Sequence, residues 1–236
     1  MIPFRALLAA ELRKTVSTRA ARVLLAASLA ITMAAEAIPL VFTRSVTQDH
    51  ASYLTWAALG LSRLLPIVLM MAMTAEWSQR TALTTFTLEP NRGRVLGAKI
   101  TAGLIIAISC GVFAFAVGSV TASLSPHVRG GENWSVVAGF ALFVVLTSAI
   151  GIAIGAALHN TAAAIVTYFA VAGAASLLMI PALSRAGEWI DTGETFGWVL
   201  AGQWSGHAAQ ILVSAALWIA LPLLIGTVRT LRRDIA

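Results

Sequence analysis

The sequence is poor in charge and in cysteine. Only 11% of its 236 residues are charged, where a soluble domain has about a quarter, and Cys110 is the single cysteine. One thiol excludes an intrachain disulfide and a cysteine-cluster metal site, and its apolar surroundings indicate a packing role. The low charge, with 58% hydrophobic residues and a mean hydropathy of +0.85, predicts a polytopic membrane protein without a sizeable soluble domain.

The usual catalytic and metal-binding motifs are also missing. The segment Gly93–Lys99 is only faintly similar to a phosphate-binding loop, because an alanine separates its second glycine from the lysine. No His-Glu-x-x-His motif occurs, and the four histidines are scattered. Three carboxylates recur at every third position, which is more typical of a solvated helix face than of a metal site: Glu188, Asp191 and Glu194. We therefore expect no catalytic site and no metal site in this chain.

Apolar runs long enough to cross a bilayer core of about 30 Å organise the chain. They predict an all-α fold in which residues 1–236 form one transmembrane domain, and no internal repeat is visible. The six predicted spans are residues 22–42, 53–75, 100–124, 135–158, 162–183 and 209–228.

Basic residues are distributed unevenly about these spans. The loops facing away from the termini carry only Arg44, Arg129 and Arg185. The positive-inside rule therefore predicts that both termini are cytoplasmic. We expect the chain to lie in the plasma membrane. Topology also explains the net charge of +6, so no nucleic-acid partner is expected. Twelve basic residues share the side of the termini: Arg5, Arg13, Lys14, Arg19, Arg22, Arg80, Arg92, Arg94, Lys99, Arg229, Arg232 and Arg233.

Residues 3–19 precede the first span and have helical periodicity. Apolar side chains from Phe4 to Val16 recur at helical spacing, and the charged residues, Glu11 among them, take the other positions. This pattern predicts an amphipathic helix lying in the membrane interface, with its basic residues toward anionic headgroups. The alternative is a solvated extension of the first span.

Two charged residues fall inside predicted spans, Glu36 in the first and Arg63 in the second. Because a charge in hydrocarbon costs at least about 2.5–3.5 kcal/mol, such residues usually face the bundle interior and pair. At about 1.5 Å per residue, they lie about 10 Å and about 15 Å below the outer surface. We therefore hypothesise that Glu36 and Arg63 form an intramembrane pair or line a polar cavity. The alternative is that either side chain snorkels to the outer interface.

The longest polar segment between two spans, Glu76–Lys99, contains an acidic residue after the second span, an Arg-Thr pair, a helical run, and a proline followed by basic residues. On these residues the chain resembles the ABC-2 type permeases, the membrane subunits of ABC exporters, and looks most like the short actinobacterial versions. The N-terminal helix and the six spans also match, so the resemblance covers nearly the whole chain. Arg80 departs from the pattern, since many relatives have glycine there. The matching residues are Glu76, Arg80, Thr81, Leu83 to Leu88, Pro90, Arg92, Arg94 and Lys99.

The resemblance implies a fold like that of type V ABC exporters and a permease that hydrolyses no ATP itself. Two permease subunits, identical or different, would each sit on a separate ABC ATP-binding subunit that holds ATP and Mg²⁺. The pair would export an amphiphilic or hydrophobic substrate such as a drug, a peptide or a lipid. In this family the loop before the last span closes the outer exit with short re-entrant helices, and the extracellular residues 184–208 fit this, with glycines at 187, 193, 197 and 202 as breaks.

By the same resemblance, residues 76–93 hold the coupling helix, which docks into a groove of the ATP-binding subunit. Trp77, Leu83 and Phe86 would be its apolar anchors, while Glu76 and Glu89 would make polar contacts and Pro90 would end the helix. An ordinary amphipathic loop is the alternative. The residues assigned to coupling are Glu76, Trp77, Arg80, Thr81, Leu83, Phe86, Pro90, Arg92 and Arg94.

Two other classes of function compete with the permease. A stand-alone ion-coupled carrier requires titratable groups in the membrane, and only Glu36 qualifies clearly. Such a carrier is often built from two inverted repeats, which the sequence does not show. An intramembrane enzyme would require clustered nucleophiles and histidines in the spans, and these are absent from the sequence.

Overall fold

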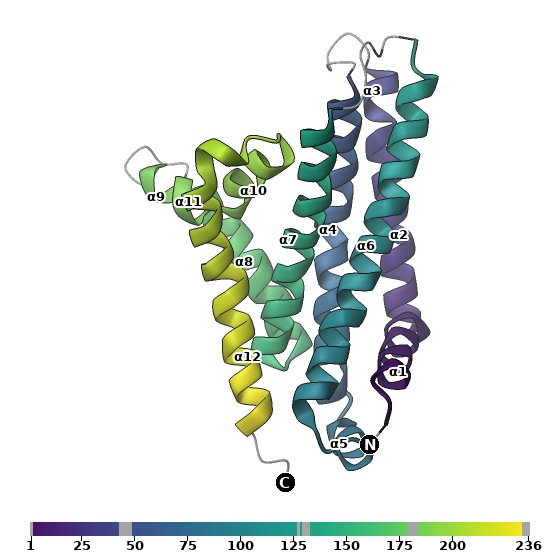
Figure 1. Cartoon of the computed structure of the whole chain (residues 1–236), viewed down its shortest axis with the longest axis vertical. Coiled ribbons are helices and arrows are strands. Elements are labelled where there is room, and N and C mark those ends of the chain that lie inside the picture. Colours follow the sequence, from purple (N-terminus) through teal and green to yellow (C-terminus); the bar gives the residue numbers. More distant parts are fainter. Residues whose placement is uncertain (1, 43–48, 127, 129–132, 179–183, 233–236) are drawn as a thin grey trace.

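The computed structural model describes residues 2–42, 49–126, 128, 133–178 and 184–232, and no β-strand occurs among them. Five helical segments are long and apolar enough to cross a membrane, and they run along the long axis of the molecule (Figure 1). The prediction of an all-helical chain is confirmed for the described residues, and these five segments have the length and hydropathy that membrane spans require. The five segments are Arg19–Val41, His50–Ser78, Arg92–Leu124, Trp134–Leu158 and Trp204–Arg232.

The predicted count of six spans depends on one further helix. Helix α8 spans Thr161–Leu178, where the sequence predicts the fifth span at 162–183. Residues 179–183 lie outside the described residues, as do 43–48 and 129–132 in the two outer loops. A tight turn precedes α8, because His159 ends the preceding helix in a left-handed conformation with φ of 52°. Six spans therefore stay a prediction.

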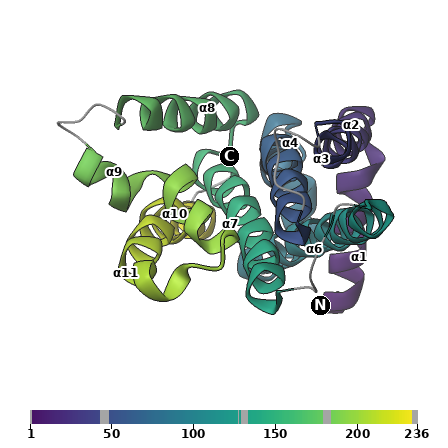
Figure 2. The ribbon, with the colours of Figure 1, turned by 90° about the horizontal axis from the view of Figure 1, so that it is seen from above.

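The first three helices follow one another almost without a loop. Helix α1 (Phe4–Ser17) crosses the long axis of the bundle (Figures 1 and 2). Thr18 caps α2 (Arg19–Glu36) by accepting a hydrogen bond from the backbone of its first turn. Helix α3 (Ile38–Val41) continues the direction of α2 after a break at Ala37, next to Pro39. Pro39 lies in the first turn of α3, where its missing N–H costs no helical hydrogen bond.

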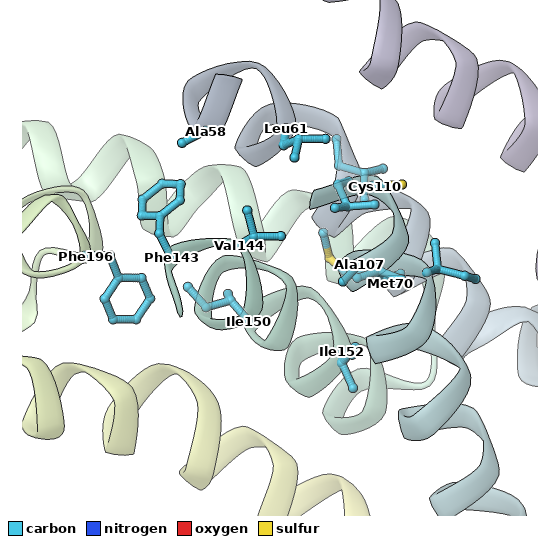
Figure 3. Close-up of a cluster of buried hydrophobic side chains, with 14 of the residues drawn as sticks. Ala58, Leu61, Met70, Ala107, Cys110, Phe143, Val144, Ile150, Ile152 and Phe196 are labelled. Carbon is cyan, nitrogen blue, oxygen red and sulfur yellow. The ribbon is translucent and has the colours of Figure 1, made fainter. Parts of the chain in front are cut away.

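The centre of the bundle is α4 (His50–Ser78), which packs against α2, α6 (Arg92–Leu124), α7 (Trp134–Leu158) and α8. Its buried side chains meet those of α6 and α7 in one hydrophobic core, where Val144 lies near Cys110 (Figure 3). Cys110 is buried there, as its apolar context predicts. Helix α4 is thus covered by neighbours on several sides and positions the elements at both of its ends.

Close contact between α4 and α7 depends on two glycines. The sequence Gly151-Ile-Ala-Ile-Gly155 is a small-xxx-small motif, which permits close approach of two helices in a membrane. A Cβ atom on Gly151 would overlap the carbonyl of Pro66, and one on Gly155 would lie 2.9 Å from the Cβ of Met73. Both clashes are with α4, so the backbones of α4 and α7 approach as closely as these glycines allow.

Replacing Gly151 should therefore destabilise the bundle. We expect Gly151→Ala to lower the stability by about 1–3 kcal/mol, because the added methyl group overlaps fixed backbone. Gly97→Ala on α6 is the matched control, since its Cβ would meet nothing within 4 Å and alanine favours the helix. Thermal unfolding in lipid nanodiscs measures both variants. Equal melting temperatures for Gly151→Ala and wild type would contradict the close approach.

The predicted outer loop, 184–208, contains two short helices and the start of the last span. Asp191 separates α9 (Ser184–Ile190) from α10 (Thr192–Leu200), and Gly202, with φ of +72°, turns the chain into α11 (Trp204–Ala215). The prediction of short helical pieces is confirmed. The glycines at 187, 193 and 197 lie inside helices, so their predicted role as breaks is wrong. The last span continues through a π-helix, η1 (Ala216–Ala220), into α12 (Leu221–Arg232).

Candidate functional site at the α5 end

The long polar segment forms a tight turn at one end of the bundle, called here the α5 end (Figure 1). Helix α4 continues to Ser78, Arg80 turns the chain with φ of 57°, and α5 spans Ala82–Leu88. Asn91 then caps α6 by accepting a hydrogen bond from the backbone of Arg94. The helical run predicted at Leu83 to Leu88 is present as α5, whereas Glu76 and Trp77, which were also assigned to coupling, belong to the end of α4.

Four charged side chains meet beneath α5 and form what we call the ion cluster: Glu11, Lys14, Glu76 and Lys99. The Nζ atom of Lys99 lies 2.8 Å from Glu11 and 3.4 Å from Glu76. The Nζ atom of Lys14 lies 2.7 Å from Glu11 and 2.9 Å from Glu76. Two lysines thus neutralise two carboxylates, and the cluster joins α1, α4 and α6.

Helix α5 is attached to the ion cluster by Thr85. Its hydroxyl donates to a carboxylate oxygen of Glu76 at 2.8 Å, and that same oxygen accepts from Lys14. Glu76 is only 4% exposed, so it does not offer the polar contact to a partner that the sequence predicted. A displacement of α5 therefore acts on three other helices through a single buried carboxylate.

The ion cluster also corrects the prediction for the N-terminal helix. Glu11 is 3% exposed and faces α6 together with Leu7 and Thr15, the residues one turn before and after it. Glu11 was expected on the polar face of this helix, but the structure buries it against α6. A buried carboxylate requires a charged or hydrogen-bonding partner, and Lys99 on α6 supplies it.

Lys14 is the half-exposed member of the ion cluster, and two opposing effects act on its pKa. Burial alone would lower the pKa, but the hydrogen bonds to Glu11 and Glu76 and the charges of these carboxylates raise it above its ordinary value. Lys14 is therefore protonated at neutral pH. Because the folded pKa is the higher one, its contribution to stability is complete below the unfolded pKa and is lost only in strongly alkaline solution.

A second buried carboxylate, Glu89, holds the end of α5 against the N-terminal segment. It is 1% exposed, pairs with Arg94 at 3.2 Å and accepts a hydrogen bond from the backbone of Ile2. Arg94 in turn donates to the carbonyl of Ile2 at 2.7 Å. Glu89 and Arg94 therefore make intramolecular contacts, and the prediction that Glu89 faces a partner is wrong.

The aromatic residues predicted as partner anchors also pack within the chain. The ring of Trp77 lies 6.3 Å from that of Phe86 and 4.4 Å from that of His159, at the start of the turn before α8. Phe86 is covered on its other side by the guanidinium of Arg92, 5.4 Å from the ring centre, and Arg92 donates to the carbonyl of Thr230 on α12. Trp77 and Phe86 thus attach α5 to the bundle.

What α5 presents outward is a small surface, which we call the outer face of α5. Its leucines, Leu83 and Leu88, are 52% and 68% exposed although they sit on a helix held by buried ion pairs. The other exposed residues predicted for coupling border them: Arg80, Thr81 and Pro90. Of the nine residues assigned to coupling, four remain available to a partner: Arg80, Thr81, Leu83 and Pro90.

A cavity of about 440 Å³ lies beside the ion cluster, between α1, α2, α4 and α5. Its walls include Glu11, Lys14, Glu76 and Lys99 as well as the hydroxyl groups of Thr85 and Thr161. This space allows α5 and the ends of α1 and α4 to move relative to one another. Across the residues that the structure describes, no three His, Cys, Asp or Glu side chains group closely enough to hold a metal ion.

The predicted intramembrane pair does not form. Glu36 is 1% exposed, and neither of its carboxylate oxygens has a hydrogen-bond partner. It lies near Gly118 of α6, whose Cβ would be 3.5 Å from Oε1. Arg63 instead lines a cavity on another side of α4, beside Tyr168 of α8. Successive side chains of an α-helix point in directions about 100° apart around its axis. The sequence does not reveal which face of α4 meets α2.

Sequence reasoning missed the contacts of Lys14, His159 and Thr230. Lys14 reaches Glu76 across 62 positions, and His159 reaches the hydroxyl of Thr230 at 3.0 Å across 71. Only the spacing of Leu7, Glu11 and Thr15 along one helix face gave a signal in the sequence.

No protein-family model, curated protein or solved structure matches the chain. Function is therefore inferred from the geometry of the described side chains.

Proposed function

We propose that this chain is the permease subunit of an ATP-driven ABC exporter, which moves an amphiphilic or hydrophobic substrate out of the cell. The observation that carries the proposal is the outer face of α5. Two exposed leucines project from a short helix that Thr85 and the ion cluster attach to α1 and to two spans, α4 and α6. Apolar side chains on a firmly held helix outside the spans favour docking to another protein.

The distribution of charge supports a cytoplasmic position for the α5 end. Arg92, Arg94 and Lys99 on α6 and Arg229 and Arg232 on α12 all belong to this end of the bundle. Basic residues collect on the cytoplasmic side of membrane proteins. We therefore place α5 in the cytoplasm of a multi-pass plasma-membrane protein with six spans, where an ATP-binding subunit carrying ATP and Mg²⁺ would meet it.

The proposed mechanism is mechanical, and this chain contributes no chemistry to it. Closure of two ATP-binding subunits around nucleotide would displace α5 on each of two permease subunits. The ion cluster transmits that displacement to α1, α4 and α6, because Glu76 joins them through Thr85, Lys14 and Lys99. Rigid-body tilting of these helices would then switch the access of the transport path between the two sides of the membrane.

Co-purification tests the proposal directly. The chain is co-expressed with each candidate ABC ATP-binding subunit of its own genome in turn, extracted in mild detergent and assayed for ATP turnover. We expect a stable complex whose ATP turnover differs from that of the ATPase alone. If no candidate associates with the chain at micromolar concentration and the turnover is unchanged, the proposal is wrong.

A stand-alone ion-coupled carrier is the second candidate, and Glu36 favours it. This buried carboxylate inside the first span has no hydrogen-bond partner, a feature of groups that take up and release protons in transporters. The carrier predicts transport that is driven by a pH gradient without nucleotide and is lost in Glu36→Gln. The exporter predicts transport that requires ATP and survives this substitution.

A further inference from the structure

We propose that the cavity around Arg63 binds the anionic head of an amphiphile that carries a single phosphate or carboxylate group. The cavity measures about 270 Å³ and lies between α4, α7, α8, α10 and η1. The proposal depends on the proposed function in one respect: the amphiphile bound here would be the class of substrate that the exporter moves. Binding itself requires neither ATP nor the partner subunit.

Arg63 supplies the charge. It is the fourteenth residue of the 29-residue α4, so it lies close to the middle of a span, and its side chain is exposed toward the cavity. No carboxylate forms an ion pair with it among the described residues. A guanidinium at this depth without an anion is costly, and its planar donors match the oxygens of a phosphate or a carboxylate.

The groups next to Arg63 on α4 and α8 do not take the place of such an anion. Pro66 has no N–H, so the carbonyl of Ser62, one turn earlier on α4, loses its helical partner. Tyr168 of α8 compensates by donating its hydroxyl to that carbonyl at 3.0 Å. The bond attaches α8 to α4 at the edge of the cavity and occupies the Tyr168 hydroxyl, so Arg63 remains the cationic group there.

Asp191 is the acidic residue of the cavity wall, and its carboxylate is already engaged. It caps α10 by accepting a hydrogen bond from the backbone of Gly193 at 2.8 Å. The positive end of the helix dipole of α10 therefore lies beside this carboxylate and offsets part of its charge. Asp191 thus stabilises the local fold and leaves Arg63 to the ligand.

The remaining wall is apolar and fixed in place. Trp218 projects from the π-helix η1, and its indole N–H donates to the carbonyl of Ile190 at 2.7 Å. Short π-helical segments frequently mark functional positions in a helix. Leu59, Phe143 and Ile150 complete a surface suited to methylene groups. Because ligand pockets usually reach about 300–1,000 Å³, this one admits a head group and a short apolar segment, with any longer chain extending outside.

Binding to the purified chain tests the proposal without a transport assay. The chain is placed in nanodiscs of neutral phosphatidylcholine and titrated with decyl phosphate, decanoate, decanol and decyltrimethylammonium. We expect the two anions to raise the melting temperature and the alcohol and the cation to leave it unchanged. Native mass spectrometry of protein extracted from cell membranes identifies the source of the ligand. A retained anionic phospholipid indicates a lipid ligand, whereas an empty site that binds added decanoate indicates a soluble ligand.

Substitutions locate the site. Arg63→Gln should weaken decyl phosphate binding about 10- to 100-fold, and Arg63→Lys should restore part of it. Gly197→Leu provides a second test, because Gly197 lines the cavity and its Cβ would meet nothing within 4 Å, so a larger side chain there reduces the space left for a ligand. Arg5→Gln on the exposed face of α1 is the matched control. Absence of binding by wild type, equal binding by Arg63→Gln and Gly197→Leu, or equal binding of the cationic analogue would overturn the proposal.

Discussion

Lys99→Met is expected to be the most destabilising single substitution at the α5 end. It removes the ammonium that lies 2.8 Å from Glu11 and leaves that carboxylate, 3% exposed, with Lys14 as its remaining cation. Removal of one partner from a buried ion pair costs about 3–5 kcal/mol, because the other charge stays buried. The midpoint of unfolding in mixed micelles measures this loss.

Two further variants separate the charge from the packing. Glu11→Gln/Lys99→Met removes both partners of the 2.8 Å pair and should recover a large part of the lost stability, because a neutral amide is less costly to bury than a carboxylate. Lys14→Met should cost only about 1 kcal/mol, since the Lys14 side chain is half exposed and Lys99 still pairs with both carboxylates. Wild-type stability in Lys99→Met would show that the ion cluster does not hold these helices together.

Leu83→Ala/Leu88→Ala is expected to weaken the binding of the ATP-binding subunit about 100-fold while leaving the fold intact. Both side chains are more than half exposed in the free chain, so their truncation removes little internal packing. At an interface, a buried anchor residue contributes about 1–2 kcal/mol or more. Biolayer interferometry with the permease in nanodiscs measures the affinity, and the melting temperature reports on the fold.

Trp77→Ala and Phe86→Ala, unlike the leucine substitutions, should lower the stability of the permease itself. The ring of Trp77 contacts Phe86 and His159, and Phe86 is covered by Arg92, so we expect lower melting temperatures of the permease. Leu124→Ala is the matched control for the exposed leucines, because Leu124 is 75% exposed at the far end of α6. If Leu83→Ala/Leu88→Ala bound the partner as wild type does, the outer face of α5 would not be the docking surface.

The positions of the spans could be read from the sequence because hydrophobic length is a local property. Residues 135–158 were predicted and Trp134–Leu158 is observed, and 53–75 became His50–Ser78. The start of α6 was placed at 100, eight residues late. The first two turns of α6 carry Arg92, Arg94 and Lys99, which end a hydrophobic run but do not end a helix.

The side-chain contacts of the site could not be read in the same way. Glu76 and Glu89 look like surface residues in a polar segment, and their burial depends on Lys99, Lys14 and Arg94 reaching them from other helices. The separation between Lys99 and Glu11 is 88 positions, which no periodic pattern covers. The failed pairing of Glu36 with Arg63 has the same origin, because depth in the membrane was predictable and the rotation of α4 about its axis was not.

The most direct test of the account is cross-linking from the outer face of α5. Cys110 is the single cysteine, so Leu88→Cys in a Cys110→Ala background provides one thiol at the proposed interface, and Leu124→Cys provides the control. In membranes that contain the ATP-binding subunit, we predict that the thiol at position 88 cross-links to this subunit in an ATP-dependent manner, and that the thiol at 124 does not. Labelling of position 88 by an impermeant maleimide added outside intact cells, or no cross-link to any nucleotide-binding protein, would contradict a cytoplasmic coupling helix.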